Sequence, residues 1–592
     1  MDFRRLFNIF HYQLGRYPQK IALAHLEEGK WQKFSTQACI DLINEISAGL
    51  LDLGLSKGDK VGLLFESGSA YFNFLDFGLL QIGVITVPIH SNVPQEELTY
   101  ILKDAEIKIC FTSTEKLYRK VAQLSDQIVS LKNIFCLEQF DDVPYWKDII
   151  KHVDDEHMAI FNDMKSVIHE EDIATIMYTS GTSGMPKGVM LTHKNIVSNI
   201  KSIISLIPIN CDKRVVSFLP LSHIFERMVT FTYIAAGASI YYVEQGENVI
   251  KTLKEIKPHY FTSVPKLLER IYVGILDRGN QRGKFGKAVL NWSLSLGERY
   301  KGKRGMNPFY YLKLRLADIL VYRQWRNALG GRVEGVVVGA AALQPKLGRL
   351  FSAAGIEIRE GYGLTETSPV IAFNRFEPGG VQFGTVGIPI PGVRIKIDDP
   401  DENGAGEIFV KGPGVMLGYH KKEALTKEVI DEDGWFHTGD IGKMVHKRFL
   451  KITDRKKDIF KTSSGKYIAP QILENLLNSS PYIEHSLITG FNKPHVGALV
   501  VPDFDRLKTW CETHNVHWTA PQYMAINPKI IKFMAEIIQE LNEKVTSTEK
   551  VKQFVLLYEP WTVEAGEITP TLKLKRTAIA KKYQKEIDGL FS

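Results

Sequence analysis

Short apolar runs rich in β-branched residues alternate with longer amphipathic stretches between about residues 170 and 365. The runs that predict strands are ATIMY (174–178), VVSFL (215–219), ASIYYV (238–243), YFTSV (260–264), VEGVVV (333–338) and IEI (356–358). The stretches that predict helices are ENVIKTLKEI (247–256), PKLLERIYVGIL (265–276) and QPKLGRLFSAA (344–354). This βαβ order predicts an α/β fold with layered, largely parallel sheets. In such sheets ligands collect beyond the carboxyl ends of the strands.

The rest of the chain predicts further parts around this core. Residues 277–332 predict helices, and after about residue 380 glycine-punctuated short strands predict a β-rich subdomain. We expect a large domain over residues 1–453 and a small mobile α+β domain over residues 454–592, because a charge-dense crossing lies near residue 454. Three earlier runs predict more strands of the large domain: VGLLFES (61–67), GVITVPI (83–89) and IKICFT (107–112).

Length and composition favour a folded enzyme of several domains. A chain of 592 residues exceeds one ordinary core, and its apolar fraction of 44% with 24% charged residues is that of globular proteins. The net charge of +7, from 74 basic and 67 acidic side chains, mildly favours anionic ligands. Without a long basic block, no nucleic-acid partner is expected.

Cysteine usage and hydropathy predict a cytoplasmic location. The five cysteines are scattered without a CxxC pair, which favours a reducing compartment. The first residues, MDFRRLFNIFHYQLGRYPQK, lack the apolar core of a secretion signal, and no run of 18 apolar residues predicts a membrane span. Peripheral contact with the inner membrane surface stays open.

The strongest local feature is YTSGTSGMPKGVMLTH, residues 178–193. A predicted strand opens into a loop of hydroxyl residues and glycines that ends in Pro-Lys-Gly. Glycines let backbone N–H groups approach an anion, hydroxyls add donors and a lysine supplies a point charge. The Walker pattern GxxxxGK[ST] is absent from the chain. A mobile linker is the alternative, but the position at a strand's carboxyl end favours phosphate binding.

This stretch resembles the signature loop of the adenylate-forming superfamily, which includes acyl-CoA synthetases, coumarate ligases, peptide-synthetase adenylation domains and luciferases. The resemblance implies that the loop binds ATP and AMP and that Lys187 takes part in catalysis. The loop residues that it assigns to the nucleotide are Thr179, Ser180, Gly181, Thr182, Ser183, Gly184 and Lys187.

Two further segments resemble the superfamily's nucleotide site. By resemblance, EGYGLTET (360–367) places Tyr362 against the adenine ring, Thr365 at the α-phosphate and Glu366 on Mg²⁺. A carboxylate is a suitable ligand for this hard cation. GAAAL (339–343) resembles the small-residue segment beside the nucleoside. The other residues assigned to the nucleotide here are Ala340, Ala341, Glu360, Gly361 and Gly363.

Three segments in the last third complete the resemblance. WFHTGD (435–440) implies that Asp440 takes the ribose hydroxyls. DRKKDIFK (454–461) implies that Arg455 contacts the ribose or phosphates and that Lys457 is the hinge between domains.

TPTLKLKR (569–576) resembles the segment with the adenylation lysine, although Thr571 and Leu572 replace the usual small residue and glycine. Alignment on Lys-apolar-x-Arg selects Lys573. Lys575 stays open as an alternative.

Other segments resemble the long-chain fatty acyl branch. PLSHIFER (220–227) resembles that branch near the acyl and pantetheine channel and implies a role for His223. LADILVYRQWRNALGGR (316–332) and SSGKYIAPQILEN (463–475) are also similar to it.

The resemblance implies an ATP-dependent, Mg²⁺-requiring ligase that converts a long-chain fatty acid to acyl-AMP and then transfers the acyl group to coenzyme A. Three alternatives remain open. The first is an enzyme that adenylates another acid or charges a carrier-protein thiol. The second is a catalytically inactive nucleotide-binding regulator. The third is a membrane-surface structural protein, suggested by the basic, aromatic insert at 300–325.

Overall fold

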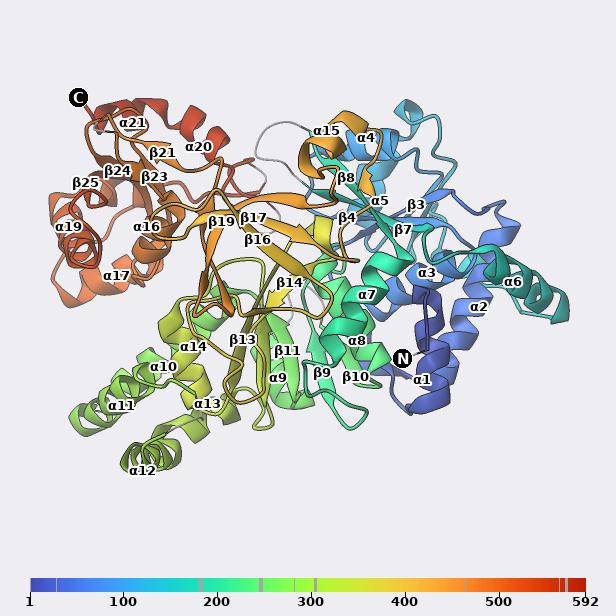
Figure 1. Ribbon diagram of the computed structural model, residues 1–592, viewed down its shortest axis with the longest axis horizontal. Coiled ribbons are helices and arrows are strands. Elements are labelled where there is room, and N and C mark those ends of the chain that lie inside the picture. Colours follow the sequence, from blue (N-terminus) through green and yellow to red (C-terminus); the bar gives the residue numbers. More distant parts are fainter. Residues whose placement is uncertain are drawn as a thin grey trace. The chain divides into compact units, whose positions relative to one another are not determined.

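The computed structural model describes residues 2–27, 29–179, 185–243, 249–281, 283–302, 306–463, 465–563, 565–569 and 573–592. The chain forms two compact units (Figure 1). Unit 1 consists of Met1–Ile395, Val410–His437 and His446–Leu450. Unit 2 consists of Lys396–Phe409, Thr438–Val445 and Lys451–Ser592. Whether residues 1–453 and 454–592 act as the large and mobile domains stays a prediction.

One sheet of unit 1 has the strand order β15-β14-β13-β12-β11-β9-β10-β1-β2 in the described part of the chain. The six strands from β13 to β1 in this order are mutually parallel, and antiparallel strands flank them on both sides. The strands are β1 (Leu23–Glu27), β2 (Lys30–Phe34), β9 (Arg214–Ser217), β10 (Ser239–Tyr242), β11 (Tyr260–Ser263), β12 (Gly335–Val338), β13 (Glu357–Gly363), β14 (Val370–Phe373) and β15 (Ile388–Pro389).

The second sheet of unit 1 has the order β18-β8-β7-β4-β3-β5-β6 among the described residues. Its strands are β3 (Lys60–Phe65), β4 (Ile85–His90), β5 (Ile109–Thr112), β6 (Asn133–Cys136), β7 (Ile173–Thr179), β8 (Lys187–Thr192) and β18 (Gly418–Tyr419). Strands β7 to β6 in this order pair in parallel, and β8 returns antiparallel beside β7. The predicted α/β fold with layered parallel sheets is therefore confirmed.

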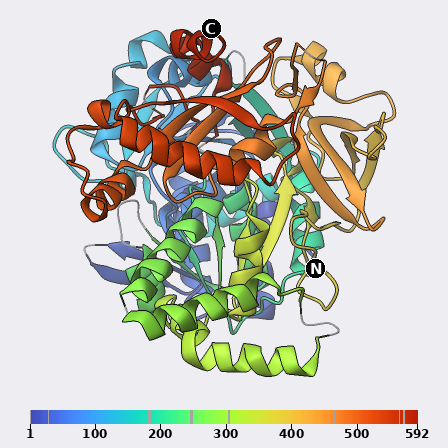
Figure 2. The ribbon, with the colours of Figure 1, turned by 90° about the vertical axis from the view of Figure 1, so that its left-hand side faces the viewer.

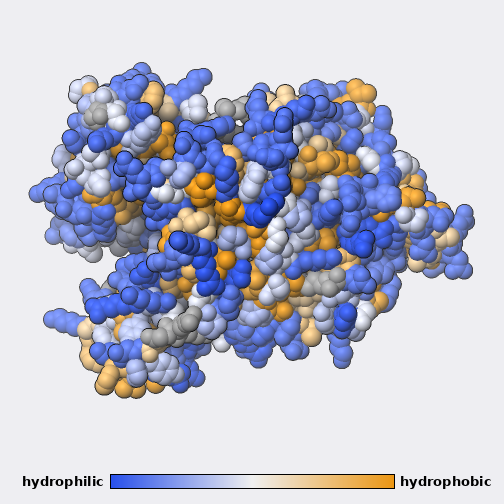
Figure 3. All heavy atoms as spheres, viewed as in Figure 1, coloured by the Kyte–Doolittle hydropathy of each residue, from blue (hydrophilic) through white to orange (hydrophobic). Residues whose placement is uncertain are grey.

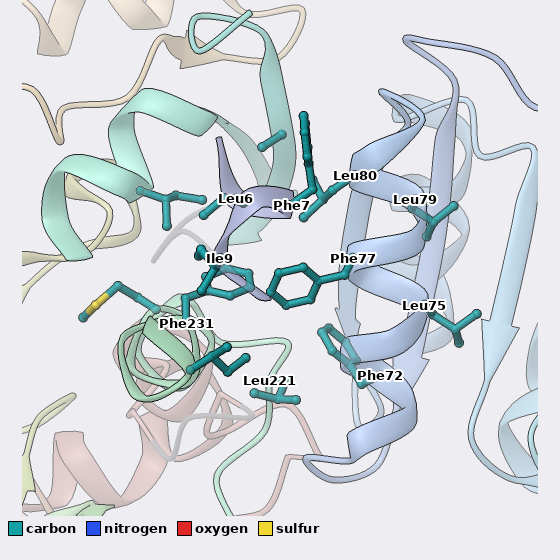
Figure 4. Packing of buried hydrophobic residues seen from close by; sticks show 14 of the residues in the cluster. Leu6, Phe7, Ile9, Phe72, Leu75, Phe77, Leu79, Leu80, Leu221 and Phe231 are labelled. Carbon is teal, nitrogen blue, oxygen red and sulfur yellow. The ribbon is translucent and has the colours of Figure 1, made fainter. Parts of the chain in front are cut away.

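Helices of unit 1 cover these sheets, and one large core cluster joins them. In Figure 4, Phe77 of α3 points toward Phe231 of α8. Phe77 lies 4.8 Å from Phe10 and 5.5 Å from Phe231 between ring centroids. The helices outside the region of α10 to α13 are η1 (Leu6–Asn8), α1 (Ile9–Arg16), α2 (Thr36–Asp52), α3 (Ala70–Gln81), α4 (Gln95–Asp104), α5 (Glu115–Ala122), η2 (Ser125–Gln127), η3 (Trp146–Ile149), α6 (Asp155–Val167), α7 (His193–Ile204), α8 (Ile224–Ala235), α9 (Val249–Ile256), α14 (Pro345–Ala353), η5 (Thr365–Thr367) and α15 (Glu423–Val429).

Two adjacent charged residues of α8 contact both sheets. Glu226 accepts hydrogen bonds from Ser217 of β9, at 2.6 Å, and from Thr262 of β11. Arg227 donates to Thr86 of β4 at 2.7 Å and to Thr175 of β7 at 2.8 Å. The guanidinium also pairs with the buried Asp76 of α3, with Nε 2.9 Å from Oδ2. The Arg227–Asp76 ion pair is buried with both charges compensated, so removing one partner would leave the other uncompensated. We call Glu226 and Arg227 the α8 charge pair.

The predicted helical region after residue 277 is confirmed. It consists of the end of α10 (Pro265–Asn280), α11 (Gly283–Glu298), α12 (Pro308–Ala317), the π-helix η4 (Asp318–Tyr322) and α13 (Arg323–Ala328). The long lime-green helix at the lower edge of Figure 2 contains α12. Figure 3 shows apolar atoms gathered at the lower left, over α12. None of the helices in the described ranges is long and apolar enough to cross a bilayer.

Unit 2 contains most of the four-stranded sheet β16-β17-β19-β20, the pair β21-β22 and the sheet β23-β24-β25. These strands are β16 (Arg394–Asp398), β17 (Gly406–Lys411), β19 (Phe436–Val445), β20 (Phe449–Arg455), β21 (Phe460–Lys461), β22 (Tyr467–Ile468), β23 (Ile483–Thr489), β24 (Val496–Pro502) and β25 (Val551–Leu556). Its helices are α16 (Pro470–Leu477), α17 (Phe504–Thr513), α18 (Pro521–Met524), α19 (Pro528–Asn542), α20 (Arg576–Lys582) and α21 (Gln584–Gly589). The last 140 or so residues thus form an α+β region with its own apolar core.

Candidate functional site

Several predicted site residues lie at the carboxyl ends of parallel strands in unit 1. Thr179 ends β7, and Ala340 and Ala341 lie two and three residues after the end of β12. Strand β13 pairs in parallel with β12, with Val338 opposite Glu360, and continues to Gly363. The predicted strand over 356–358 is thus longer than expected. Glu360, Gly361, Tyr362 and Gly363 belong to its carboxyl end, the usual ligand position in such sheets.

Lys187 and Glu366 meet at one tyrosine. The Lys187 ammonium lies 5.1 Å from the centroid of the Tyr419 ring. The Tyr419 hydroxyl donates a hydrogen bond of 2.9 Å to Glu366 Oε1. Strand pairing explains the approach, because Tyr419 of β18 lies opposite Val189 of β8, two residues beyond Lys187. A cation and a carboxylate are therefore held beside the same ring. We call Lys187, Glu366 and Tyr419 the lysine–tyrosine–glutamate group.

Sequence reasoning missed Tyr419. Its burial first, and then the charge of Glu366 and the hydrogen bond to it, raise the pKa of the phenol far above its ordinary value. The hydroxyl therefore stays protonated at neutral pH and can keep donating to the carboxylate. The signal available in the sequence was weak: Tyr419 directly follows the glycine-punctuated run 412–418.

Glycine at position 363 allows the chain to turn between β13 and the segment that carries Thr365 and Glu366. A Cβ on Gly363 would lie 1.9 Å from the carbonyl oxygen of Pro369, so no other residue fits without a backbone shift. Thr365 and Glu366 then form η5, where Met416 N–H donates to the Glu366 carbonyl at 2.8 Å. Glu366 is thus held by two hydrogen bonds, one to its main-chain carbonyl and one to its carboxylate.

The two acidic residues of the EGYGLTET segment have different environments. Burial raises the pKa of Glu360 to about 8, and the Leu343 N–H lies 3.4 Å from its Oε1. Glu360 is thus predominantly neutral near pH 7 and suits a hydrogen-bonding role. Glu366 is partly exposed and accepts from Tyr419. The ring of Tyr362, on the same strand, is 8% exposed.

His223 caps the N-terminus of α8, where its Nδ1 accepts from the Phe225 N–H at 3.2 Å. Its ring lies 6.3 Å from that of His90. The Phe225 ring also lies against Gly339, since a Cβ there would be 3.2 Å from its Cζ atom. The start of α8 therefore borders the segment that carries Ala340 and Ala341. Ser180, Gly181, Thr182, Ser183 and Gly184 lie outside the described residues.

In unit 2, Asp440 of β19 and Arg455 of β20 form an ion pair. Arg455 Nε lies 3.2 Å from Asp440 Oδ1, and the Asp440 side chain is only 7% exposed. The carboxylate is also positioned by its main chain, because Asp440 N–H donates to Thr438 Oγ1 at 3.1 Å. The structure thus brings together two residues that the sequence assigned to the ribose and phosphate region.

The predicted hinge residue Lys457 and adenylation lysine Lys573 both belong to unit 2. Lys457 is exposed in the turn after β20, followed by Asp458. Arg576 Nε lies 3.5 Å from Asp458 Oδ2, and Nη2 pairs with the buried Glu474 of α16. Lys573, three residues before Arg576, pairs through its main chain with Thr569: the Thr569 N–H donates to the Lys573 carbonyl at 2.7 Å. The Lys575 N–H donates to the Glu567 carbonyl at 2.8 Å.

The donor set fits a magnesium ion that is shared with a nucleotide. Among the described residues, no three His, Cys, Asp or Glu side chains are grouped so as to hold a metal. Mg²⁺ commonly takes one or two carboxylates together with substrate phosphates and water. The partly exposed Glu366 carboxylate, which is held by Tyr419, suits that role.

The fold and these residues define an adenylate-forming enzyme, and the chain belongs to the AMP-binding enzyme family. Residues 10–420 match the family model "AMP-binding enzyme", and residues 457–592 match "AMP-binding enzyme C-terminal domain". The predicted superfamily is confirmed.

Named relatives are long-chain-fatty-acid–CoA ligases. One from Mycobacterium bovis is 31% identical over 585 residues, which cover 97% of this chain and 95% of the relative. Long-chain-fatty-acid–CoA ligase 1 of Homo sapiens is 30% identical over 588 residues, covering 95% and 82%. The predicted similarity to the long-chain branch is confirmed.

Solved structures share the fold. The A domain of a carboxylic acid reductase from Segniliparus rugosus, in complex with AMP and a co-purified carboxylic acid, matches with a TM-score of 0.76 and 18% identity, covering 99% of this chain and 94% of that one. The anthranilate CoA ligase AuaEII, in complex with anthranoyl-AMP, matches with a TM-score of 0.72 and 18% identity, covering 99% and 98%.

Proposed function

We propose that this enzyme joins a long-chain fatty acid to coenzyme A in two steps, with ATP as the energy source and acyl-AMP as the intermediate. The observation that carries the proposal is the lysine–tyrosine–glutamate group, which holds an ammonium and a carboxylate beside one ring. The chemistry of a nucleotide phosphate needs both signs of charge, a cation for its oxygens and an anion for its metal. Full-length relatives that carry the long-chain ligase name support the choice of acid.

In the first step a carboxylate oxygen of the fatty acid attacks the α-phosphorus of ATP. The oxygen–phosphorus bond to the acyl group forms, and pyrophosphate leaves. Negative charge on the phosphate oxygens must be stabilised, for which we assign Lys187, Thr365 and Lys573. When bound at Glu366, Mg²⁺ supplies further positive charge to these oxygens. Burial keeps the Tyr419 hydroxyl protonated, so it holds the Glu366 carboxylate in one orientation.

The adenosine part of the nucleotide needs different contacts. We assign the adenine ring to Tyr362, whose ring is largely buried at the end of β13. Ala340 and Ala341 leave room for the nucleoside, since small side chains allow close backbone approach. Asp440 accepts from the ribose hydroxyls, and Arg455 orients that carboxylate. The described ends of the nucleotide loop, Thr179 and Lys187, are assigned to the phosphates.

In the second step the thiol of coenzyme A loses its proton and attacks the acyl carbonyl carbon, after which AMP leaves. Lys573 is no longer required at the phosphate in this step. We propose that the small domain, residues 454–592, rotates about Lys457 between the steps and so withdraws Lys573. His223, at the start of α8, is assigned to the acyl and pantetheine channel.

A coupled AMP-release assay across saturated carboxylic acids of increasing length tests the proposal. AMP should accumulate with acids of about twelve or more carbons, only when coenzyme A is present, and acyl-CoA should form in equal amount. AMP release that needs a carrier-protein thiol, or that prefers aromatic acids, would overturn the choice of acceptor or acid. Binding of ATP without any pyrophosphate exchange would indicate an inactive regulator.

We also propose that the enzyme works in the cytoplasm. The five cysteines are free, and Cys39, Cys110, Cys136 and Cys511 are buried, as expected for thiols in a reducing compartment. Fractionation of cells into soluble, membrane and secreted material, followed by immunodetection, would test this location.

A further inference from the structure

The continuous helix formed by α12, η4 and α13 has two apolar sides. The inner side packs on the rest of unit 1. Its residues Leu314, Ala317 and Val321 follow helical spacing and are 8%, 0% and 9% exposed. Tyr310 belongs to the same side and donates from its hydroxyl to the Leu296 carbonyl at 2.8 Å. This side alone would explain an ordinary amphipathic surface helix.

The outer side is apolar as well. Its large side chains recur at intervals of three and four residues, which places them in one stripe. We call these residues the outer stripe: Phe309, Leu312, Leu316, Ile319 and Leu320, at 78%, 68%, 51%, 69% and 43% exposure. Single exposed apolar residues are normal, whereas a contiguous set indicates an interaction surface. Figure 3 shows this concentration of apolar atoms over α12.

Basic side chains border the outer stripe. At roughly 100° per residue, Lys313 and Arg315 project to opposite sides of the line through Phe309, Leu312 and Leu316. Both are exposed. The acidic residue nearest in sequence, Asp318, is paired with Arg326, with Nη1 2.5 Å from Oδ1. The border of the stripe is therefore positive.

We propose that the outer stripe inserts into the interface of an anionic lipid bilayer, with Lys313 and Arg315 at the lipid headgroups. An apolar helix face bordered by cations is the pattern of helices that lie in a bilayer surface. Long basic side chains reach headgroups while their stems cover apolar surface. Membrane insertion would bring the enzyme to its substrate, because a long-chain fatty acid dissolves in a bilayer. The purpose of this insertion therefore rests on the proposed function.

A second copy of the chain is a less suitable occupant. Each of the five side chains exposes on the order of 100 Å², so the stripe offers roughly 500 Å². A stable protein interface buries about 800 Å² on each partner. The positive borders would also repel each other across a symmetric contact, whereas they attract anionic headgroups.

Flotation of the full-length protein with vesicles tests the proposal. The parent should float with vesicles of phosphatidylcholine and phosphatidylglycerol, and the double variant Leu312→Ser/Ile319→Ser should bind at least tenfold less. The matched control, Val129→Ser/Val167→Ser, removes two valines of unit 1 that are 89% and 54% exposed and should float like the parent. Lys313→Gln/Arg315→Gln should lose several-fold binding to anionic vesicles and should weaken the dependence of binding on salt.

Three results would overturn the proposal. The first is equal flotation of the parent and Leu312→Ser/Ile319→Ser, and the second is no flotation of the parent. The third is a concentration-dependent dimer that this variant abolishes while vesicles bind neither protein. Flotation needs no turnover, so failure of the proposed ligase activity would be seen separately in the AMP-release assay. Thermal unfolding of the variant should match that of the parent, because all the changed side chains are exposed.

Discussion

The hydroxyl of Tyr419 donates a hydrogen bond of 2.9 Å to the carboxylate of Glu366, and the same ring lies 5.1 Å from the ammonium of Lys187. Tyr419 is therefore the residue through which strand pairing between β18 and β8 orients the proposed magnesium ligand. It touches the two charged groups and has no assigned contact with the substrate, so we regard it as a positioning residue.

Tyr419→Phe should raise the Mg²⁺ concentration needed for half-maximal rate about three- to tenfold, because a typical intramolecular hydrogen bond contributes roughly 1 kcal/mol. Magnesium titration of the pyrophosphate-exchange rate would measure this change. Tyr310→Phe is a control, since it also removes the hydrogen bond of a partly buried phenol in unit 1. An equal effect of both variants would contradict a positioning role for Tyr419.

Lys573→Ala should slow acyl-AMP formation by at least a hundredfold and leave thioester formation from supplied acyl-AMP nearly unchanged. The reason is that positive charge is needed while the α-phosphate carries developing negative charge. Single-turnover measurements of each half-reaction give the two rates. Lys575→Ala is the control, and the opposite outcome for the two lysines would assign adenylation to Lys575.

Glu226→Gln should make thermal stability less sensitive to pH. Burial raises the pKa of Glu226 from 4.5 to about 7, so the folded state favours the neutral carboxyl. The contribution of the neutral carboxyl to the free energy of unfolding is complete below about pH 4.5 and is lost as the pH rises through 7. The total change is up to about 3 kcal/mol, at about 1.4 kcal/mol per pKa unit.

The melting temperatures of the parent and Glu226→Gln should agree near pH 5, and the variant should melt higher at pH 8. Differential scanning calorimetry from pH 5 to 8 would record this. The exposed Glu428→Gln serves as the control and should show no such divergence. A melting temperature of Glu226→Gln that differs from the parent's by the same amount at every pH would contradict the role of burial.

Arg576→Met should destabilise unit 2 by about 3 kcal/mol, because the carboxylate of Glu474, only 1% exposed, would lose its charged partner. The double variant Glu474→Gln/Arg576→Met should recover much of this loss. Urea unfolding of the four proteins forms a double-mutant cycle. Additive effects of the two single changes would contradict the ion pair's importance.

Periodicity predicted the regular parts of the fold well. The runs at 174–178 and 260–264 are the parallel strands β7 and β11, and the helix predicted over 344–354 is α14. β13 extends beyond its predicted run because Arg359 to Gly363 are held by pairing with β12 and β14 rather than by intrinsic strand preference.

The candidate site was only partly visible from the sequence. Motifs located Lys187 and Glu366, but the tyrosine between them comes from residue 419 and is brought in by strand pairing. The α8 charge pair lies within PLSHIFER, where the sequence pattern pointed to the acyl channel. Burial of both charges, at 0% and 1% exposure, depends on partners from four strands and α3 and leaves no periodic signal.

The α8 charge pair has a mechanical consequence for catalysis. Neighbouring residues of one helix bond to β9 and β11 of one sheet and to β4 and β7 of the other, so sliding of the sheets past each other would break these hydrogen bonds. The edges that carry Thr179 and Tyr362 belong to these two sheets. Unit 1 can thus present a preformed surface to the nucleotide, and little of the binding energy is spent on rearranging it.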